Sequence, residues 1–132
     1  MNCCPLQESD EYAEVYDVSH PTAAKVHRCS ECKEPIPVGA KHELVDMLFD
    51  GDWSHWRTCM SCAEIRKHFA CGGAVIGELW WDLAENFFPE MKAGGPCMEG
   101  LSPENKARLF TYRMAWLLND RCLDLPLSQP SA

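Results

Sequence analysis

Two pairs of cysteines have the spacing of metal ligands. Cys29 and Cys32 form one Cys-x2-Cys pair, and twenty-six residues separate it from a second pair, Cys59 and Cys62. A Cys-x2-Cys turn lets two sulfurs reach one ion, and four thiolates complete a tetrahedron around a borderline-soft ion such as zinc. One such pair is a weak signal, but two pairs in a short chain are a strong one. The sequence therefore predicts one structural zinc ion, held by these four cysteines.

The residues between the pairs predict the elements that position them. Residues 42–49 and 52–58 have the pattern of two strands, joined by an Asp-Gly turn that suits a tight hairpin. The second cysteine pair then opens residues 63–70, which have helical composition. The predicted order is a cysteine knuckle, a hairpin, and a cysteine pair on the first turn of a helix.

This order resembles the treble-clef zinc finger, the family that includes half of a LIM domain and many ribosomal and phage zinc proteins. The resemblance covers residues 25–71, about a third of the chain, and implies a structural zinc with the four cysteines as ligands. It implies no particular function, since treble clefs serve binding and nuclease roles alike. Five short runs carry a finer resemblance: HRCSEC at 27–32, PIPVG at 35–39, FDGDW at 49–53, RTC at 57–59 and CAEIR at 62–66. Together they resemble small bacteriophage and prophage proteins, and this resemblance implies a phage-encoded protein of the bacterial host cytoplasm.

Length and charge narrow the class of protein. The chain has 132 residues, 46% of them hydrophobic, which suits one compact domain. Twelve Lys and Arg against twenty Asp and Glu give a net charge of -8, which disfavours general binding to a phosphate backbone. No apolar run reaches the 18 or so residues of a membrane span, and the first ten residues lack the features of a secretory signal. The sequence therefore predicts a protein of the reducing cytoplasm.

Five further cysteines show no paired spacing. In a reducing compartment we expect them to be free thiols without a metal role, most of them small buried hydrophobes. A second metal site built from Cys71, Cys97 and a histidine stays an alternative. The five are Cys3, Cys4, Cys71, Cys97 and Cys122.

The predicted fold class is α+β, with a treble-clef module followed by two packed helices. Residues 1–24 form an acidic N-terminal arm, in which 13–18 alternate like an edge strand, and residues 25–73 form the zinc module. Residues 74–123 form the helical part packed on that module, with a mobile loop at 92–97. Residues 124–132 form a flexible tail.

The helical part has more apolar surface than one core requires. A helix is predicted over residues 75–88, with Trp80 on its apolar stripe and Trp81 displaced from it. A second helix begins after Ser102 and ends near Arg121, with two apolar ridges. Ala107, Phe110, Met114 and Leu117 form the first ridge, which we expect to be core. The predicted partner face combines the second ridge with the first helix and consists of Trp81, Phe88, Leu109, Tyr112 and Trp116. That both ridges are core stays an equal alternative.

Catalytic patterns are weak. A nuclease of the HNH type carries adjacent acidic and histidine residues on its first hairpin strand, but Asp46 has no histidine beside it. His55 is expected to be a half-buried strand residue, and Glu64 and His68, one helical turn apart, a solvated pair. We therefore expect no enzymatic activity and no catalytic residues.

The predicted function is a zinc-stabilised, non-enzymatic protein-interaction module of phage type. Its partner would be a host or viral protein or a second copy of the chain, and one form of it is an acidic inhibitor whose arm imitates nucleic acid. The first alternative is a nucleic-acid-binding regulator that uses basic residues around the zinc, namely Lys25, His27, Arg28, Lys33, Arg57, Arg66 and Lys67. The second alternative is an HNH-like metal nuclease.

Overall fold

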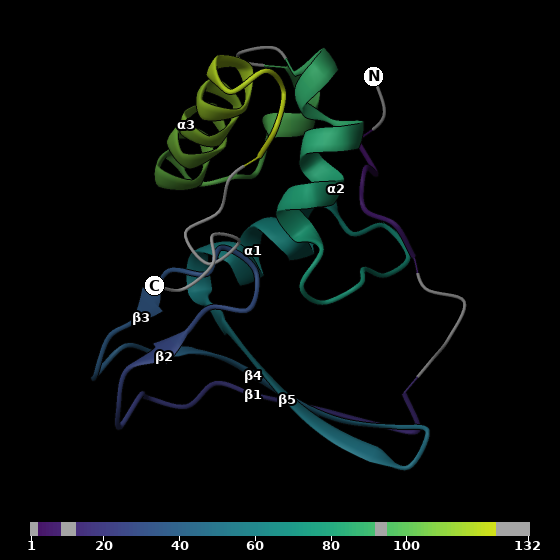
Figure 1. The fold of residues 1–132 in the computed structure, drawn as a ribbon, viewed down its shortest axis with the longest axis vertical. Helices are drawn as coiled ribbons and strands as arrows, with labels where there is room; N and C mark the ends of the chain where they lie inside the picture. The colour runs from purple at the N-terminus through teal and green to yellow at the C-terminus, as the bar shows by residue number, and fades with distance from the viewer. Residues whose placement is uncertain (1–2, 9–12, 92–94, 124–132) are drawn as a thin grey trace.

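The computed structural model describes residues 3–8, 13–91 and 95–123. Within these ranges the chain has a mixed architecture of three α-helices, two 3-10 turns and two antiparallel sheets. The helices lie together at one end of the molecule, and the larger sheet extends away from them (Figure 1). The predicted tail at 124–132 lies outside the described residues.

The larger sheet is built on a hairpin of β4 (His42–Phe49) and β5 (Asp52–Cys59). Asp50 and Gly51 form its turn with φ values of 50° and 82°, and such a turn with two positive φ angles matches the twist of paired strands. On the other edge of β4 lies β1 (Val15–Ser19), so the strand order is β1-β4-β5. Both the hairpin and the edge strand were predicted from the sequence, and the structure confirms them.

The smaller sheet frames the first cysteine pair. Its strands are β2 (His27–Arg28) and β3 (Pro35–Ile36). The connecting turn is closed by hydrogen bonds from Cys29 N to Glu34 O (2.9 Å) and from Lys33 N to Cys29 O (3.0 Å). The predicted knuckle is therefore a short hairpin.

The second cysteine pair opens α1 (Met60–Phe69), three residues earlier than predicted. Cys59 is the N-cap residue, and its Sγ accepts a hydrogen bond from the Cys62 N–H (3.5 Å). The cap needs no Ser or Asp, because the cysteine itself satisfies one of the free amide donors of the first turn.

The helix predicted over 75–88 is shorter in the structure. It is α2 (Leu79–Asn86), followed by the 3-10 turn η1 (Phe88–Glu90). Gly77 has φ of +94°, which a right-handed helix cannot contain, so the helix begins only after it. No side chain of α2 caps its start. Instead, Glu31 Oε1 accepts the Leu79 N–H at 3.2 Å from a distant part of the sequence.

The last helix is α3 (Pro103–Leu118), and Ser102 caps it as predicted, accepting the Asn105 N–H at 3.2 Å. It ends earlier than predicted, because Asp120 and Arg121 both have positive φ. The predicted mobile loop 92–97 is also corrected. Its last two residues belong to the 3-10 turn η2 (Pro96–Met98), which buries Cys97, whereas residues 92–94 lie outside the described part.

The second ridge of α3 faces inward, whereas the first ridge is exposed except at Phe110, which packs against the core. Leu109 and Trp116, predicted for a partner face, are 0% and 5% exposed and belong to the core. Met114 and Leu117, predicted as core, are 54% and 37% exposed. Both ridges are hydrophobic enough to face the core, so hydrophobicity does not decide which one does. Packing against α2 and η1 decides it, and the centre of the Trp116 ring lies 5.6 Å from that of the Phe88 ring.

The N-terminal segment is tied to the helical part. Cys3 is disulfide-bonded to Cys97, and Cys4 to Cys71. Between these links and the sheet, Leu6 is buried, and Gln7 N donates to Asp82 Oδ2 on α2 at 3.1 Å. The described part of the predicted acidic arm is thus a covalently anchored strap followed by an edge strand.

These disulfides overturn the expectation of five free thiols. Of the five cysteines outside the four-cysteine cluster, Cys122 alone remains a free thiol, and it is exposed. No helix in the described part of the chain is both long enough and apolar enough to cross a membrane.

Candidate metal centre

Four sulfur atoms meet where the smaller sheet, β5 and α1 come together. Cys29 and Cys32 come from the turn between β2 and β3, Cys59 is the last residue of β5, and Cys62 lies in the first turn of α1. The four Sγ atoms all lie within 4.8 Å of one another. An ion with sulfur ligands at about 2.3 Å places tetrahedral sulfurs about 3.8 Å apart. The cluster could therefore hold a metal ion with little rearrangement.

The cluster is mostly buried, and backbone amides point at its sulfurs. Cys29, Cys32 and Cys62 are at most 1% exposed, whereas Cys59 is half-buried. The Cys59 N–H donates to Cys29 Sγ at 3.3 Å, and the Cys62 N–H donates to Cys59 Sγ at 3.5 Å. These donors orient the sulfurs and favour their thiolate form.

The sulfurs are close enough to alter one another's protonation. Hydrogen bonding with Cys32 is the main cause that lowers the pKa of Cys29, to about 7. Hydrogen bonds from the other three cysteines also lower the pKa of Cys59, and bonds within the cluster raise the pKa of Cys32 and of Cys62. A divalent cation at the centre would allow all four to be thiolates.

Two side chains from the helical part donate hydrogen bonds to the cluster. Trp80 Nε1 on α2 lies 3.4 Å from Cys62 Sγ. Arg108 Nη1 on α3 lies 3.2 Å from the same sulfur and 3.7 Å from Cys59 Sγ. Neither contact could be predicted from the sequence, because the partners are far apart in the chain and neither Trp80 nor Arg108 belongs to a motif.

A buried ion-pair network supports the first cysteine pair. Glu31 lies between Cys29 and Cys32, is 1% exposed, and accepts a hydrogen bond from Arg66 Nε at 3.0 Å. Arg66 also donates to Glu43 on β4 at 2.6 Å and to Thr58 on β5 at 3.0 Å. The network joins the knuckle, both long strands and α1. Glu31 also caps α2, because its Oε1 accepts the Leu79 N–H.

A surface hollow of about 560 Å³ borders the cluster. Sulfur-bearing Cys32 and Cys59 line it together with Arg108, Glu34, Ser61 and Asn105. Glu34 lies 3.6 Å from Arg108 in an ion pair, and Arg108 Nη1 donates to Ser61 Oγ at 2.8 Å. The cluster therefore approaches solvent on this one side, where α3 partly covers it.

The predicted partner face is largely internal. Phe88, Leu109 and Trp116 are at most 5% exposed, and Tyr112 packs against the Trp80 ring at 4.0 Å. These four contact the chain's own helices and offer little or no free surface. Trp81 was expected to be displaced from the core stripe, and it is 40% exposed beside a fully buried Trp80. Of the five residues, Trp81 remains a candidate for contact with a partner.

The histidines singled out by the nuclease alternative have other environments. His55 Nδ1 lies 2.5 Å from Asp46 Oδ1 on the neighbouring strand, so a carboxylate-imidazole pair exists across the hairpin instead of along one strand. Its side chain is 65% exposed, which corrects the expected half-burial. Glu64 and His68 do not pair with each other. Glu64 accepts from Asn105 Nδ2 at 3.1 Å, and His68 Nε2 donates to Cys97 O at 2.7 Å.

The basic residues of the nucleic-acid alternative divide into two groups. Arg66 is held in the buried network, whereas Lys25, Arg28, Lys33 and Arg57 form no ion pair with any described residue.

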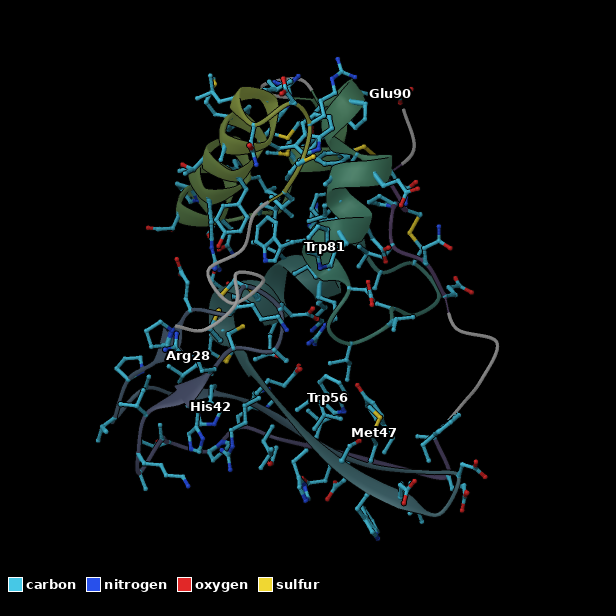
Figure 2. All side chains as sticks on the ribbon, viewed as in Figure 1. Arg28, His42, Met47, Trp56, Trp81 and Glu90 are labelled. Atoms are coloured by element: carbon cyan, nitrogen blue, oxygen red, sulfur yellow. A yellow bond between two sulfur atoms is a disulfide. The ribbon has the colours of Figure 1, made fainter. Side chains whose placement is uncertain are left out.

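Figure 2 shows how side chains are arranged along the larger sheet. Arg28 and His42 lie at the end next to the knuckle, whereas Trp56 and Met47 lie on the side that faces the helices (Figure 2).

At the knuckle end, Arg57 lies beside two histidines. Arg57 Nη1 donates to His42 Nε2 at 2.7 Å, and the His27 ring lies 5.7 Å from the His42 ring. The pKa of His27 is lowered, first by desolvation and then by the nearby charges of Arg57 and Lys25. Positive charge is thus concentrated around His27.

The chain matches no protein-family model, and comparisons with curated proteins and with solved structures also find no match. These comparisons therefore lend no support to a resemblance to phage proteins, and function has to be argued from the site itself.

Proposed function

We propose that the chain is a zinc-stabilised, non-enzymatic interaction module whose metal-binding part is a treble clef. The observation that supports this proposal most directly is that the four cysteine Sγ atoms all lie within 4.8 Å of one another. Four thiolates fill the tetrahedral coordination of zinc, so no position is left for the water or substrate that a catalytic zinc requires. Zinc is the ion of choice for an all-thiolate site of this spacing.

The element order supports the treble-clef assignment. A short cysteine-bearing hairpin, a long hairpin and a helix with a cysteine in its first turn follow one another from β2 to α1. Because Trp80 and Arg108 both donate to Cys62, the metal would hold the helical part on this module as well as close the module itself. Its role would be structural, which suits a protein that presents a surface to a partner.

Zinc analysis of the purified protein tests the proposal, with Cys32→Ser as the variant and Cys122→Ser as the matched control. Structural zinc contributes on the order of 10 kcal/mol to the folding of small modules. We expect one zinc per chain in the wild type and in the Cys122→Ser protein, and loss of zinc and of cooperative unfolding in Cys32→Ser. Metal-dependent cleavage of DNA or RNA that is lost in His55→Ala would instead favour the nuclease alternative.

A second candidate function is binding to a nucleic-acid backbone at the knuckle end of the sheet. The observation that favours it is the positive charge of Lys25 and Arg57 around His27, with no acidic partner for either cation in the described ranges. A phosphate group beside these cations would be attracted by both of them. The overall charge of -8 acts against such binding.

Fluorescence anisotropy with a labelled oligonucleotide tests this second function. Binding whose logarithm falls linearly with the logarithm of salt concentration, and which weakens in Arg57→Gln, would support it. Arg121→Gln is the control, because it removes the same charge from an exposed position after α3 that is not among the basic residues near the cluster. Equal weakening in both variants would show a non-specific effect of net charge and would contradict a site at Arg57.

A further inference from the structure

Arg108 is the one cationic side chain in the described part of the chain that contacts the sulfur cluster. Its Nη1 atom approaches Cys62 Sγ at 3.2 Å and Cys59 Sγ at 3.7 Å. These cysteines are the pair on α1, whereas Arg108 lies on α3, 46 and 49 positions further along the chain. The contact therefore connects the metal centre to a helix outside the predicted zinc module.

The guanidinium is held in place from several directions. Arg108 Nη1 also donates to Ser61 Oγ at 2.8 Å, and Nη2 donates to Tyr112 OH at 3.3 Å. The carbon at its centre lies 5.4 Å from the Trp80 ring and 5.3 Å from the Tyr112 ring. Cation-π contact and multiple donors fix a side chain that would otherwise be free to rotate. These contacts hold the guanidinium beside the two sulfurs.

Charge explains why a cation at this place matters. Four thiolates around a divalent ion carry a net charge of -2, and removing such a charge from water is costly unless it is compensated. Arg108 supplies one positive charge on the side where the cluster borders the hollow, and it is 17% exposed. Its ion pair with Glu34 at 3.6 Å is the weaker contact, because the Glu34 side chain is 54% exposed.

A hydrogen bond from a cation also changes the sulfur. It withdraws electron density from the thiolate, which makes the sulfur harder to protonate and a poorer nucleophile. Protonation or attack at a ligand sulfur is a usual first step in metal loss. The half-buried Cys59 is the accessible ligand, and Arg108 lies over it and Cys62 on the open side.

We propose that Arg108 is a positioning residue of the metal centre, which compensates the charge of the thiolates of Cys59 and Cys62 and thereby slows metal loss. This inference rests on the proposed zinc site. It adds that the site extends to α3 and that the exchange rate of the metal is set by a residue outside the four ligands.

The rate of zinc transfer to an excess of a chromogenic chelator tests the proposal. Residues that support metal ligands typically change metal affinity by about 10- to 100-fold, so we expect Arg108→Met to release zinc about 10-fold faster than the wild type. Arg108→Lys keeps the charge but replaces the planar fork, whose two nitrogens reach Cys62 and Tyr112, with a single ammonium nitrogen, so an intermediate rate is expected. Arg113→Met is the matched control, because Arg113 lies on the same helix and donates to Phe88 O at 2.9 Å without contacting a sulfur.

A spectroscopic measurement on the cobalt-substituted protein separates tuning of the sulfur from a general loss of packing. Removing a donor from a thiolate raises the energy of its lone pair, so the sulfur-to-cobalt charge-transfer band of Arg108→Met should move to longer wavelength. The band of Arg113→Met should not move. If Arg108→Met does not fold, the same shift, smaller in size, is expected in Arg108→Lys.

The outcomes distinguish the inference from the proposed function. A wild-type protein without bound metal would contradict the proposed function itself. A wild type with one zinc, together with Arg108→Met and Arg113→Met proteins that release zinc at the wild-type rate and share its cobalt spectrum, would overturn the role of Arg108 and leave the zinc site intact.

Discussion

The carboxylate of Glu31 and the guanidinium of Arg66 form a buried ion pair with a 3.0 Å hydrogen bond, 35 residues apart in sequence. Glu31 lies between Cys29 and Cys32, and Arg66 lies one turn beyond Cys62 on α1. The ion pair therefore links the two cysteine pairs of the four-cysteine cluster. Its second oxygen also fixes the start of α2 through the Leu79 N–H.

Glu31→Gln should destabilise the protein substantially. Removing one partner of a buried ion pair costs about 3 kcal/mol or more, because the other charge stays buried without full compensation. Urea unfolding of the zinc-loaded protein measures the loss as a lower midpoint. Glu99→Gln, an exposed position after η2, should change stability by less than about 0.5 kcal/mol. Equal midpoints for both variants would contradict the structural role of the pair.

The two tryptophans that were assigned to one partner face should respond differently to truncation. Trp116 is 5% exposed, so Trp116→Ala should cost about 3 to 5 kcal/mol of folding stability. Trp81 is 40% exposed, so Trp81→Ala should cost about 1 kcal/mol or less. If Trp81 anchors a partner or a second copy, that variant should also weaken the association by about 2 kcal/mol or more. Equal destabilisation by both substitutions would place Trp81 in the core.

The raised pKa of Tyr112 leads us to expect that the protein loses stability at alkaline pH. Burial raises the pKa of Tyr112 to about 12, whereas an unfolded tyrosine has a pKa of about 10. Below pH 10 both states keep the proton. As the pH rises from about 10 towards 12, the unfolded state loses its proton first, so stability falls across this window.

Tyr112→Phe should remove this part of the pH dependence. Denaturant unfolding of both proteins at about pH 9 and pH 11 measures it, and the wild type should lose more stability between the two values than the variant. Tyr16, whose pKa is also raised by burial, is present in both proteins and contributes equally. The same change with pH in both proteins would contradict the assigned environment of Tyr112.

The disulfides predict a specific pattern of thiol reactivity. Without reductant, the native zinc-loaded protein should show one reactive thiol, Cys122. Denaturation with a chelator should add the four cysteines of the cluster, and reduction should then add the four that pair as Cys3–Cys97 and Cys4–Cys71. Cys122→Ser should have no reactive thiol in the native state. Five reactive thiols in the native, unreduced protein would restore the free-thiol expectation.

Reduction should also destabilise the fold. The disulfides close long sections of chain, with sequence separations of 94 and 67 residues. In the chain-entropy model each such link contributes roughly 4 kcal/mol. Thermal unfolding with and without a dithiol reductant measures this, and Cys122→Ser serves as the control that keeps both disulfides. An unchanged unfolding temperature would indicate that the disulfides do not stabilise the native protein.

The four-cysteine cluster was predictable because the residues that specify it lie close together in the sequence. The spacing of two Cys-x2-Cys pairs, an Asp-Gly turn and alternating strands each specify structure within a few residues. The register of the hairpin follows from that turn, and it brings His42 opposite Cys59. The ligands, the hairpin and α1 all emerged in this way.

The residues that were missed act over long distances. Arg108 and Trp80 reach Cys62 only after α2 and α3 have packed, and helical periodicity cannot say which of two apolar ridges of α3 will face inward. The cysteine pairings depend on where the N-terminal strap lies, so spacing alone could not reveal them. The predicted helix over residues 75–88 began too early, because Gly77 has φ of +94°, which only the folded structure reveals.

Native mass spectrometry under non-reducing conditions tests the central claim most directly. It reports the mass of the metal on each chain together with the number of disulfides. The proposed function predicts one zinc per wild-type chain, an ion that is lost in Cys32→Ser and retained in Cys122→Ser. A wild-type chain without metal, or a Cys32→Ser chain that retains its zinc, would contradict the four-cysteine centre.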